Sequence, residues 1–358
     1  MRTSQRTEAA DLAEHAPKLW PSRAARAKLH FVSGKGGVGK STLSAALAIA
    51  LASSGRRVLL VEVEGRQSIA HLFDMPPLPY AETKVASAAN GGEVWALAID
   101  VESAILEYFE MFYNLGFAAK AMRAVGAVDF ITTVAPGLDD VVLTGKIYEI
   151  VTRTQNSGKR SALGKPPKSG TSCYDAIVVD APPTGRVDSF LGAASALKGI
   201  AKGGPVYRHA ENVSAVLRSA DTVVHLATIL EALPVQETVE AVSVIKKLGV
   251  ELGTTLVNRF PAQYLTQEQL EAAAQGSVDA NALREGLETI GLGLSPEDFA
   301  GLITETIDHA VTQARQQEQA RVLADLDLPQ LPLPLLAEGV DLGSLYELAE
   351  RLTQMGVR

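Results

Sequence analysis

The sequence predicts an α/β fold, built on a doubly wound and mostly parallel β-sheet with a helical insertion. Three observations support this prediction. Short continuous runs of Val, Ile and Leu recur along the chain, as in strands that are buried on both faces of a parallel sheet. Helix-sized segments separate these runs, which is the alternation typical of βαβ units. The chain has 358 residues, of which 47% are hydrophobic and 21% charged, so it can bury one large core.

The apolar runs give the expected strands in chain order. We expect strands at 29–33, 57–63, 94–99, 176–181, 222–228, 254–258 and 329–333. Residues 1–27 mix Ala, Arg and acidic residues without a clear hydrophobic period. They are therefore predicted to form a flexible or weakly helical N-terminal extension. A single domain is expected over residues 28–358.

Two segments interrupt the alternation of strands and helices. The first, at about 100–130, is rich in Leu, Phe, Met, Tyr and Ala and has no strand pattern after it, so it is predicted to be a helical insertion. The second, at about 154–172, combines Gly, Pro and Ser with four basic residues. This composition is typical of a flexible, solvated loop.

Composition excludes several classes of function. A net charge of −8 gives the chain no general attraction to nucleic acid or anionic lipid, so no nucleic-acid partner is expected. The N-terminal segment has acidic residues and no apolar core, unlike a secretory signal. The longest apolar run is shorter than the ~20 residues that span a bilayer. We expect a cytoplasmic protein, either free or at the periphery of a membrane partner.

The stretch SGKGGVGKST contains a phosphate-binding loop. It satisfies G-x-x-x-x-G-K-[ST], with a predicted strand before it and a long helix after it. Glycines let backbone N–H groups converge on phosphates, and the positive end of the helix points at them. The lysine supplies a charge to the β- and γ-phosphates, and the serine hydroxyl is a ligand for Mg²⁺. The expected nucleotide-binding residues are Gly34, Gly36, Gly37, Val38, Gly39, Lys40, Ser41 and Thr42.

A carboxylate for the magnesium shell is expected at the end of another buried strand. Asp180 fits this role, because it follows the apolar run AIVV and precedes a sharp turn with two prolines. Ser41 and Asp180 are thus the candidate metal residues, with Asp180 acting through a water molecule. The expected cofactors are ATP and Mg²⁺.

Four motifs resemble the deviant phosphate-loop ATPases, and within them the branch of arsenical pump ATPases and tail-anchored-protein targeting factors. Lys35 in GKGGVGKST corresponds to their additional lysine. DAPPTGR resembles their second switch, and EALPVQETVEAVSVIKKLGVELGTTLVNR resembles a strand and helix that end in a base-binding asparagine, here Asn258. LPLLAEGV resembles their C-terminal loop, so Pro334 is a further expected nucleotide-binding residue. The switch residues would be Pro183, Thr184, Gly185 and Arg186.

The resemblance implies an ATPase that works as a dimer, in which Lys35 of one subunit reaches the phosphates held by the other. Such a cation would neutralise charge on the transferred phosphoryl group. With Lys35 and Lys40, the expected catalytic residues include Glu64, which stands where the family has the aspartate that orients water. Because Glu64 is one methylene longer, turnover is expected to be slow or partner-dependent. Arg186 replaces a histidine, and either a phosphate or cross-subunit contact or a surface salt bridge would fit it.

The single cysteine, Cys173, excludes the clustered thiols of arsenite-activated pumps, a zinc-binding C-x-x-C and an iron–sulfur cluster. Three functions remain open: a dimeric switch that handles a hydrophobic or membrane client, the energising subunit of a transporter, and an ATP-binding regulatory subunit. The dimer would be a homodimer or a heterodimer with a paralogue. Apolar residues of the 100–130 segment would either line a client groove or belong to the core.

Overall fold

In the computed structural model, residues 19–113, 137–154, 172–200, 203–336 and 339–358 are described. They form one eight-stranded sheet in the order β3-β4-β2-β5-β1-β6-β7-β8, and only β3 runs antiparallel to its neighbour. The strands are β1 Leu29–Gly34, β2 Arg57–Glu62, β3 Thr83–Ser87, β4 Glu93–Ala98, β5 Ala176–Asp180, β6 Thr222–Thr228, β7 Leu252–Phe260 and β8 Gln330–Pro334. The predicted α/β fold with a mostly parallel sheet is confirmed.

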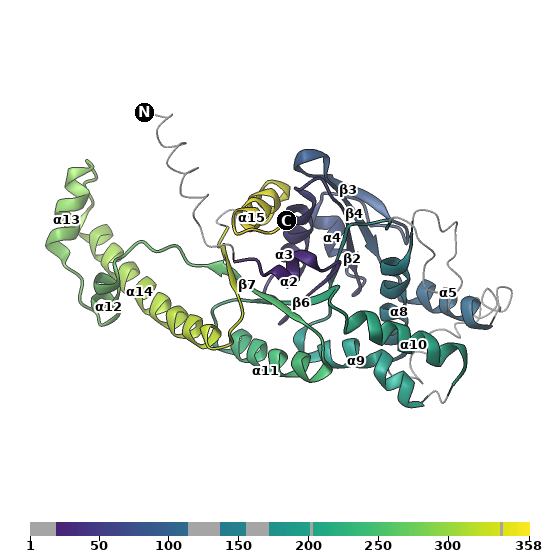
Figure 1. Cartoon of the computed structure of the whole chain (residues 1–358). Coiled ribbons are helices and arrows are strands. Elements are labelled where there is room, and N and C mark those ends of the chain that lie inside the picture. The colour runs from purple at the N-terminus through teal and green to yellow at the C-terminus, as the bar shows by residue number, and fades with distance from the viewer. Residues whose placement is uncertain (1–18, 114–136, 155–171, 201–202, 337–338) are drawn as a thin grey trace.

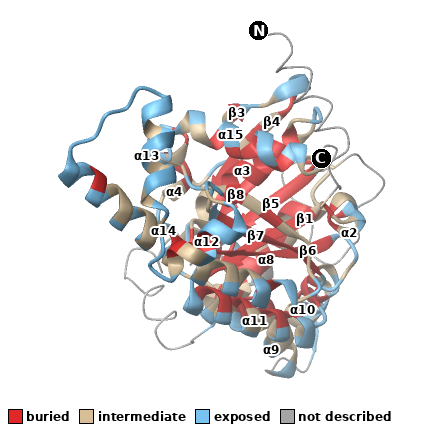
Figure 2. Ribbon diagram, turned by 90° about the vertical axis from the view of Figure 1, so that its left-hand side faces the viewer, coloured by how far each residue is buried: buried red, intermediate tan, exposed pale blue. Residues whose placement is uncertain are grey.

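Helices cover both faces of this sheet (Figure 1). One face packs against α3 Lys40–Ala52, α4 Ser68–Leu72 and α15 Leu342–Gln354. The other packs against α5 Val101–Tyr113, α8 Leu138–Thr152, α9 Thr184–Ile200, α10 Gly204–Leu217 and α11 Ala232–Leu248. The central strands are buried throughout, as Figure 2 shows, which explains why their sequences are continuous apolar runs and do not alternate.

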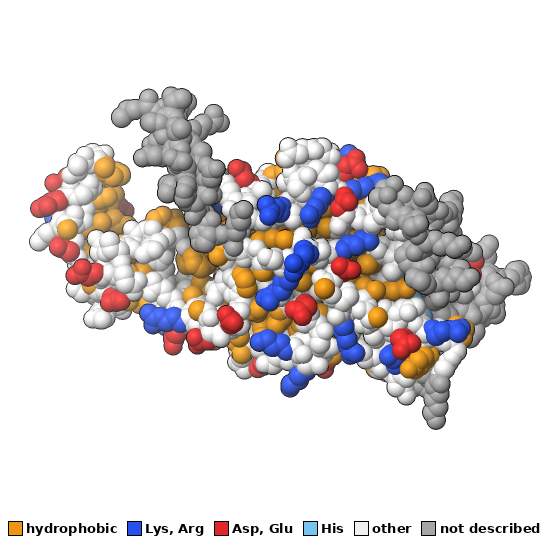
Figure 3. Space-filling view, in the orientation of Figure 1, with side chains coloured by type: hydrophobic (Ala, Val, Ile, Leu, Met, Phe, Trp, Pro, Cys, Tyr) orange, Lys and Arg blue, Asp and Glu red, His pale blue; other side chains and the backbone are white. Residues whose placement is uncertain are grey.

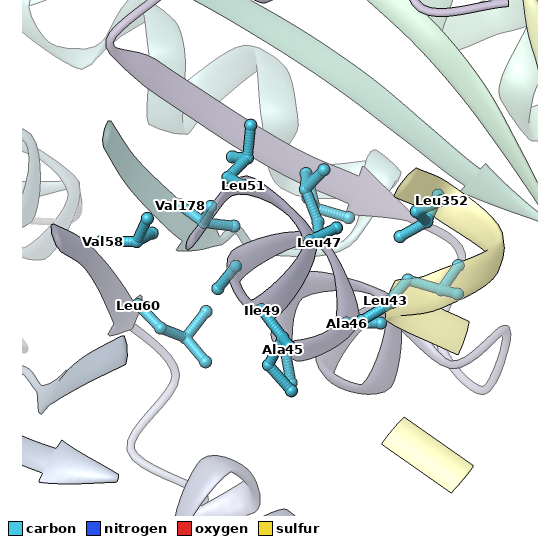
Figure 4. Close-up of a cluster of buried hydrophobic side chains, with 14 of the residues drawn as sticks. Leu43, Ala45, Ala46, Leu47, Ile49, Leu51, Val58, Leu60, Val178 and Leu352 are labelled. Carbon is cyan, nitrogen blue, oxygen red and sulfur yellow. The ribbon is translucent and has the colours of Figure 1, made fainter. Parts of the chain in front are cut away.

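Helix α3 is the best buried helix, and it fixes the phosphate loop that precedes it. Every residue from Leu43 to Ala52 is buried. Leu43 and Leu47 lie near Leu352 of α15, and Leu60 and Val178 of the sheet face the same helix (Figure 4). A helix that is apolar all round needs such cover on all sides. The N-terminus of α3 is therefore held rigidly against the sheet.

The chain begins to pack earlier than the sequence predicted. The predicted flexible extension covers residues 1–27, but its described part, from residue 19, is packed and contains α2 Ser22–Arg26. Trp20 and Ala24 are buried, and the N–H groups of Leu19 and Trp20 donate to the carbonyl of Met355. Residues 19–27 therefore pack against the domain and include the short helix α2, because the large aromatic side chain of Trp20 supplies burial that the polar composition concealed.

Two buried histidines hold Trp20 and tie the segment to the sheet. The Trp20 ring stacks on His30 and His225, at centroid distances of 6.0 and 5.0 Å. Thr254 N–H donates to His225 Nδ1 (3.2 Å), so the proton of His225 is on Nε2, which donates to His30 Nδ1 (3.1 Å). The other nitrogen of His30 then donates to the Ala27 carbonyl (3.1 Å). This chain of hydrogen bonds is complete only while both rings are neutral.

The two predicted interruptions are described only at their edges. The expected insertion at about 100–130 begins as helix α5, and residues 114–136 lie outside the described part of the chain. The basic loop at 154–172 is described only at its ends, where Thr154 and Ser172 form an isolated antiparallel bridge. The edge strand β3 and the helices between β7 and β8 were not predicted.

Candidate nucleotide site

The phosphate loop joins β1 to α3 at the carboxyl edge of the sheet. Gly37 and Gly39 have φ of 89° and 91°, a left-handed conformation that side chains other than glycine rarely adopt. Gly34 lies so close to the Ala227 carbonyl of β6 that a Cβ would collide with it. Lys40, Ser41 and Thr42 form the first turn of α3, so the backbone N–H groups of this turn face the loop.

Ser41 and Asp180, the predicted metal residues, are in direct contact. Ser41 Oγ donates to Asp180 Oδ2 at 2.6 Å, and Ser44 Oγ donates to Asp180 Oδ1 at 3.3 Å. Asp180 is buried at the end of β5, and this burial raises its pKa to about 6, although Ser41 and the charge of Lys40 act in the opposite direction. A hydroxyl and a carboxylate beside a phosphate loop are the hard oxygen ligands that Mg²⁺ takes, so the residues fit that ion.

A second buried carboxylate, Glu62, was missed by the sequence analysis. It ends β2, directly opposite Asp180 in the strand register, and is 1% exposed. Its two oxygens accept from the backbone N–H groups of Ser68 (3.1 Å) and Ile69 (3.2 Å), at the start of α4. Glu62 therefore fixes the loop between β2 and α4, which contains Glu64, and its charge contributes to the raised pKa of Asp180. The signal was present, because an acid ends the apolar run VLLV much as Asp180 ends IVV.

Lys35 is engaged by its own subunit through a residue that sequence reasoning also missed. Its Nζ lies 2.7 Å from Oε1 of Glu237 on α11. The other oxygen of Glu237 accepts from Thr184 Oγ1 at 2.8 Å, in the predicted second switch. The hydrogen bond from Lys35 lowers the pKa of Glu237, so this carboxylate is ionised at neutral pH. Glu237 thus joins the phosphate loop to the second switch.

Arg186 of the predicted second switch and Glu64 each form an ion pair within the chain. Arg186 Nη2 lies 2.8 Å from Oδ1 of the buried Asp140 on α8. Of the roles that the sequence left open for Arg186, the structure shows a salt bridge. Pro183 and Gly185 flank Thr184 at the start of α9. Glu64 lies in the loop after β2, and its carboxylate is 3.8 Å from Arg66 Nη2. This ion pair joins two residues of the same loop and does not connect Glu64 with the phosphate loop.

Asn258 lies against the phosphate loop. Its Nδ2 donates to the carbonyl of Val38 at 2.8 Å, and the same amide lies where a Cβ on Gly39 would be. The predicted nucleotide-binding residue Pro334 ends β8 and is paired with Phe260, two residues after Asn258. The structure therefore brings the predicted phosphate, magnesium and base residues to one edge of the sheet, where ligands of open α/β sheets bind.

Comparisons with known proteins agree with this geometry. The anion-transporting ATPase family model matches residues 27–202. ATPase BagA of Mycobacterium tuberculosis is 55% identical over 339 residues, which cover 95% of this chain and 96% of the relative. A putative arsenical pump-driving ATPase of Aquifex aeolicus is 28% identical over 46% of this chain and 48% of its own length. ATPase GET3 of Mycosarcoma maydis is 30% identical over 48% of this chain and 44% of its own length. The chain therefore belongs to the anion-transporting ATPase family that includes the arsenical pump-driving and GET3 ATPases, and it is an ATPase.

Proposed function

We propose that the protein is a Mg²⁺-dependent ATPase switch that works as a dimer and couples ATP hydrolysis to the handling of a client or membrane partner. The observation that carries the proposal is the position of Lys35. Its ammonium is held at 2.7 Å by Glu237, and the Lys35 side chain is 26% exposed, next to the exposed Gly36 and Gly37. A lysine at this open edge can exchange one carboxylate for the phosphates of a nucleotide on a second subunit.

The residues of the chain divide the chemistry between them. Bound Mg²⁺ would supply charge neutralisation of the phosphates, held by the Ser41 hydroxyl and, through water, by Asp180. The loop amides and Lys40 would orient the phosphates, and Lys35 from the partner would add a cation where negative charge develops. Glu64 would orient the attacking water. Its pairing with Arg66 supports slow or partner-dependent turnover, since positioning supplies most of the catalysis in phosphoryl transfer.

The coupling has a structural basis in the Lys35–Glu237–Thr184 contacts. If Lys35 moves to a partner's nucleotide, Glu237 loses one of its two side-chain partners, and Thr184 is then less firmly held. The second switch would in this way respond to dimer closure. The nature of the client is a further part of the proposal. The described end of the 100–130 segment includes Leu106, which packs against the core, so any client groove there would be formed by other residues.

Two substitutions test the proposal. Lys40→Ala should abolish ATP binding, because it removes the charge that the loop directs at the phosphates. Lys35→Ala should bind ATP with nearly unchanged affinity but lose turnover and ATP-driven dimer closure. Binding is measured with a fluorescent ATP analogue, turnover by phosphate release and closure by analytical ultracentrifugation. If Lys35→Ala dimerises and turns over like the wild type, the proposed role in trans is wrong.

An ATP-binding regulatory subunit is the second candidate, and the replacement of the water-orienting aspartate by Glu64 favours it. The family aspartate is replaced by Glu64, which pairs with Arg66. Turnover of the wild type should then be undetectable alone and appear, if at all, only with a paralogue or a membrane partner. A pull-down of the Mg²⁺-ATP-trapped protein, with mass spectrometry, identifies such a partner. Full turnover by the isolated chain would exclude this candidate.

A further inference from the structure

A long helical arm, residues 261–329, is inserted between β7 and β8. It contains α12 Gln267–Ala274, α13 Ala280–Thr289 and α14 Pro296–Ala324, and it projects away from the sheet (Figure 1). Each helix begins at a side-chain cap. Thr266 forms a capping box with Gln269, Asp279 accepts from the N–H groups of Asn281 and Ala282, and Ser295 accepts from that of Asp298.

The arm has its own packing and is a stiff element. Leu270 and Ala273 of α12 are buried against Ala310 of α14. Gln267 and Gln317 exchange hydrogen bonds between the same two helices, at 3.3 and 3.0 Å. Helix α14 has 29 residues, which corresponds to a length of about 43 Å. The tip of the arm is thus held far from the nucleotide site.

The tip carries an apolar surface that its own fold leaves open. Leu283 and Leu287 of α13 and its C-terminal cap Ile290 are spaced to share one face. The two leucines are half-buried, and no residue of this fully described helix is buried. Ile290 is 69% exposed, and Leu292 and Leu294 of the following loop are 49% and 38% exposed. We call these five residues the tip stripe. Hydrophobic side chains are visible on the surface of the arm in Figure 3.

The arm carries a large excess of negative charge. Residues 261–329 contain 12 acidic residues, three arginines and no lysine, a net charge of −9 against −8 for the whole chain. The rest of the chain is therefore close to neutral, and the negative charge of the protein is concentrated in this projection. Acidic side chains are spread over the arm in Figure 3. Such a surface repels nucleic acid and anionic lipid, and it attracts a basic partner.

We propose that the tip stripe is a docking site for a partner protein that presents an amphipathic helix with lysine and arginine on both sides of its apolar face. The five apolar side chains would be buried by that face, as in other helix-in-groove complexes. The flanking acids Glu285, Glu288 and Glu297 would pair with its basic residues. The site is separate from the nucleotide site, and the proposal does not rest on the function proposed above.

The test measures binding of the full chain to a defined helical peptide. The probe is a fluorescent peptide of about five helical turns, with leucine on one face and lysine on the others. The wild type should bind it, with an affinity that falls as salt increases. The double variant Ile290→Ser/Leu292→Ser should bind it about tenfold more weakly, because two exposed apolar anchors are lost. Val322→Ser is the matched control, since Val322 is 41% exposed near the other end of α14, and it should bind like the wild type.

Several results would overturn the proposal. One is equal binding of the basic peptide by the double variant, and another is equally tight binding of a matched leucine–glutamate peptide. Binding of phosphatidylglycerol vesicles through the tip stripe would assign the surface to lipid. Self-association of the wild type that the double variant abolishes would assign it to a second copy of the chain. Thermal unfolding monitored by circular dichroism should show that each variant is as stable as the wild type.

Discussion

The contact between Lys35 and Glu237 makes a sharp prediction about dimer formation. If Lys35 acts on a neighbouring nucleotide, Glu237 competes with that nucleotide for the ammonium group. Glu237→Gln keeps the shape of the side chain and its hydrogen bond with Thr184, but it removes the charge that holds Lys35 at 2.7 Å. The substitution should therefore favour the closed dimer in the presence of ATP.

The size of this effect follows from the exposure of the ion pair. The side chains of Lys35 and Glu237 are 26% and 29% exposed, so their pair lies between a surface and a buried salt bridge. The upper end of the range for exposed pairs, about 1 kcal/mol, is a suitable estimate. A difference of about 1 kcal/mol per lysine is a factor of about five. Two lysines cross a symmetric interface, so the dimer dissociation constant should fall by roughly 25- to 30-fold.

The dissociation constant is measured by analytical ultracentrifugation with Mg²⁺ and a non-hydrolysable ATP analogue. Glu240→Gln is the matched control, because Glu240 is exposed on the same helix and is hydrogen-bonded to Gln236. The control should dimerise like the wild type. The variant Lys35→Ala/Glu237→Gln should not gain affinity, because the released lysine is absent. An unchanged or raised dissociation constant for Glu237→Gln alone would refute the competition between Glu237 and the nucleotide.

Three further predictions concern stability and metal binding. Trp20→Ala should lower the free energy of unfolding by about 3–5 kcal/mol in urea, because Trp20 is 6% exposed; a loss below about 1 kcal/mol would return residues 19–27 to a loose extension. Burial lowers the pKa of His30 from 6.5 to about 4, so its contribution to stability is complete above pH 6.5 and is lost as the pH falls toward 4. Between these pH values the free energy of unfolding, measured by urea titration, should fall by roughly 3 kcal/mol more in the wild type than in His30→Gln. Parallel pH profiles of the two proteins would contradict this. Asp180→Asn should weaken ATP binding in the presence of Mg²⁺ by at least about tenfold and should affect Mg²⁺-free binding much less. Both affinities are measured by calorimetry. Equal losses with and without Mg²⁺ would argue against a role of Asp180 in magnesium binding.

The local sequence was sufficient to predict those features whose structure depends only on neighbouring residues in the chain. The central strands could be predicted because both of their faces are covered, which leaves continuous apolar runs. The phosphate loop could be predicted because left-handed glycines and a following helix are local requirements. Edge strand β3 was missed because only one of its residues, Ala86, is buried, so its sequence has no continuous apolar run.

Other features had local signals that were overlooked. The arm helices begin at Thr266, Asp279 and Ser295, which are common capping residues, and Pro296 follows the last of them. Their apolar faces are weak because much of the arm is solvated, so hydrophobic period alone did not reveal them. Glu62 ends an apolar strand as Asp180 does, yet its function as a cap for α4 depends on two N–H groups that come later in the chain.

The sequence by itself determined the class of sheet, the phosphate loop, the Ser41 and Asp180 pair and the membership in an ATPase family. Only the tertiary structure decided which distant side chains meet: Lys35 with Glu237, Arg186 with Asp140, and Trp20 with two buried histidines. Lys35 and Glu237 are 202 residues apart, and a half-buried glutamate within a helix has no local pattern that marks its partner. The parallel sheet brings such distant residues together, because its crossovers place the carboxyl ends of all parallel strands at one edge.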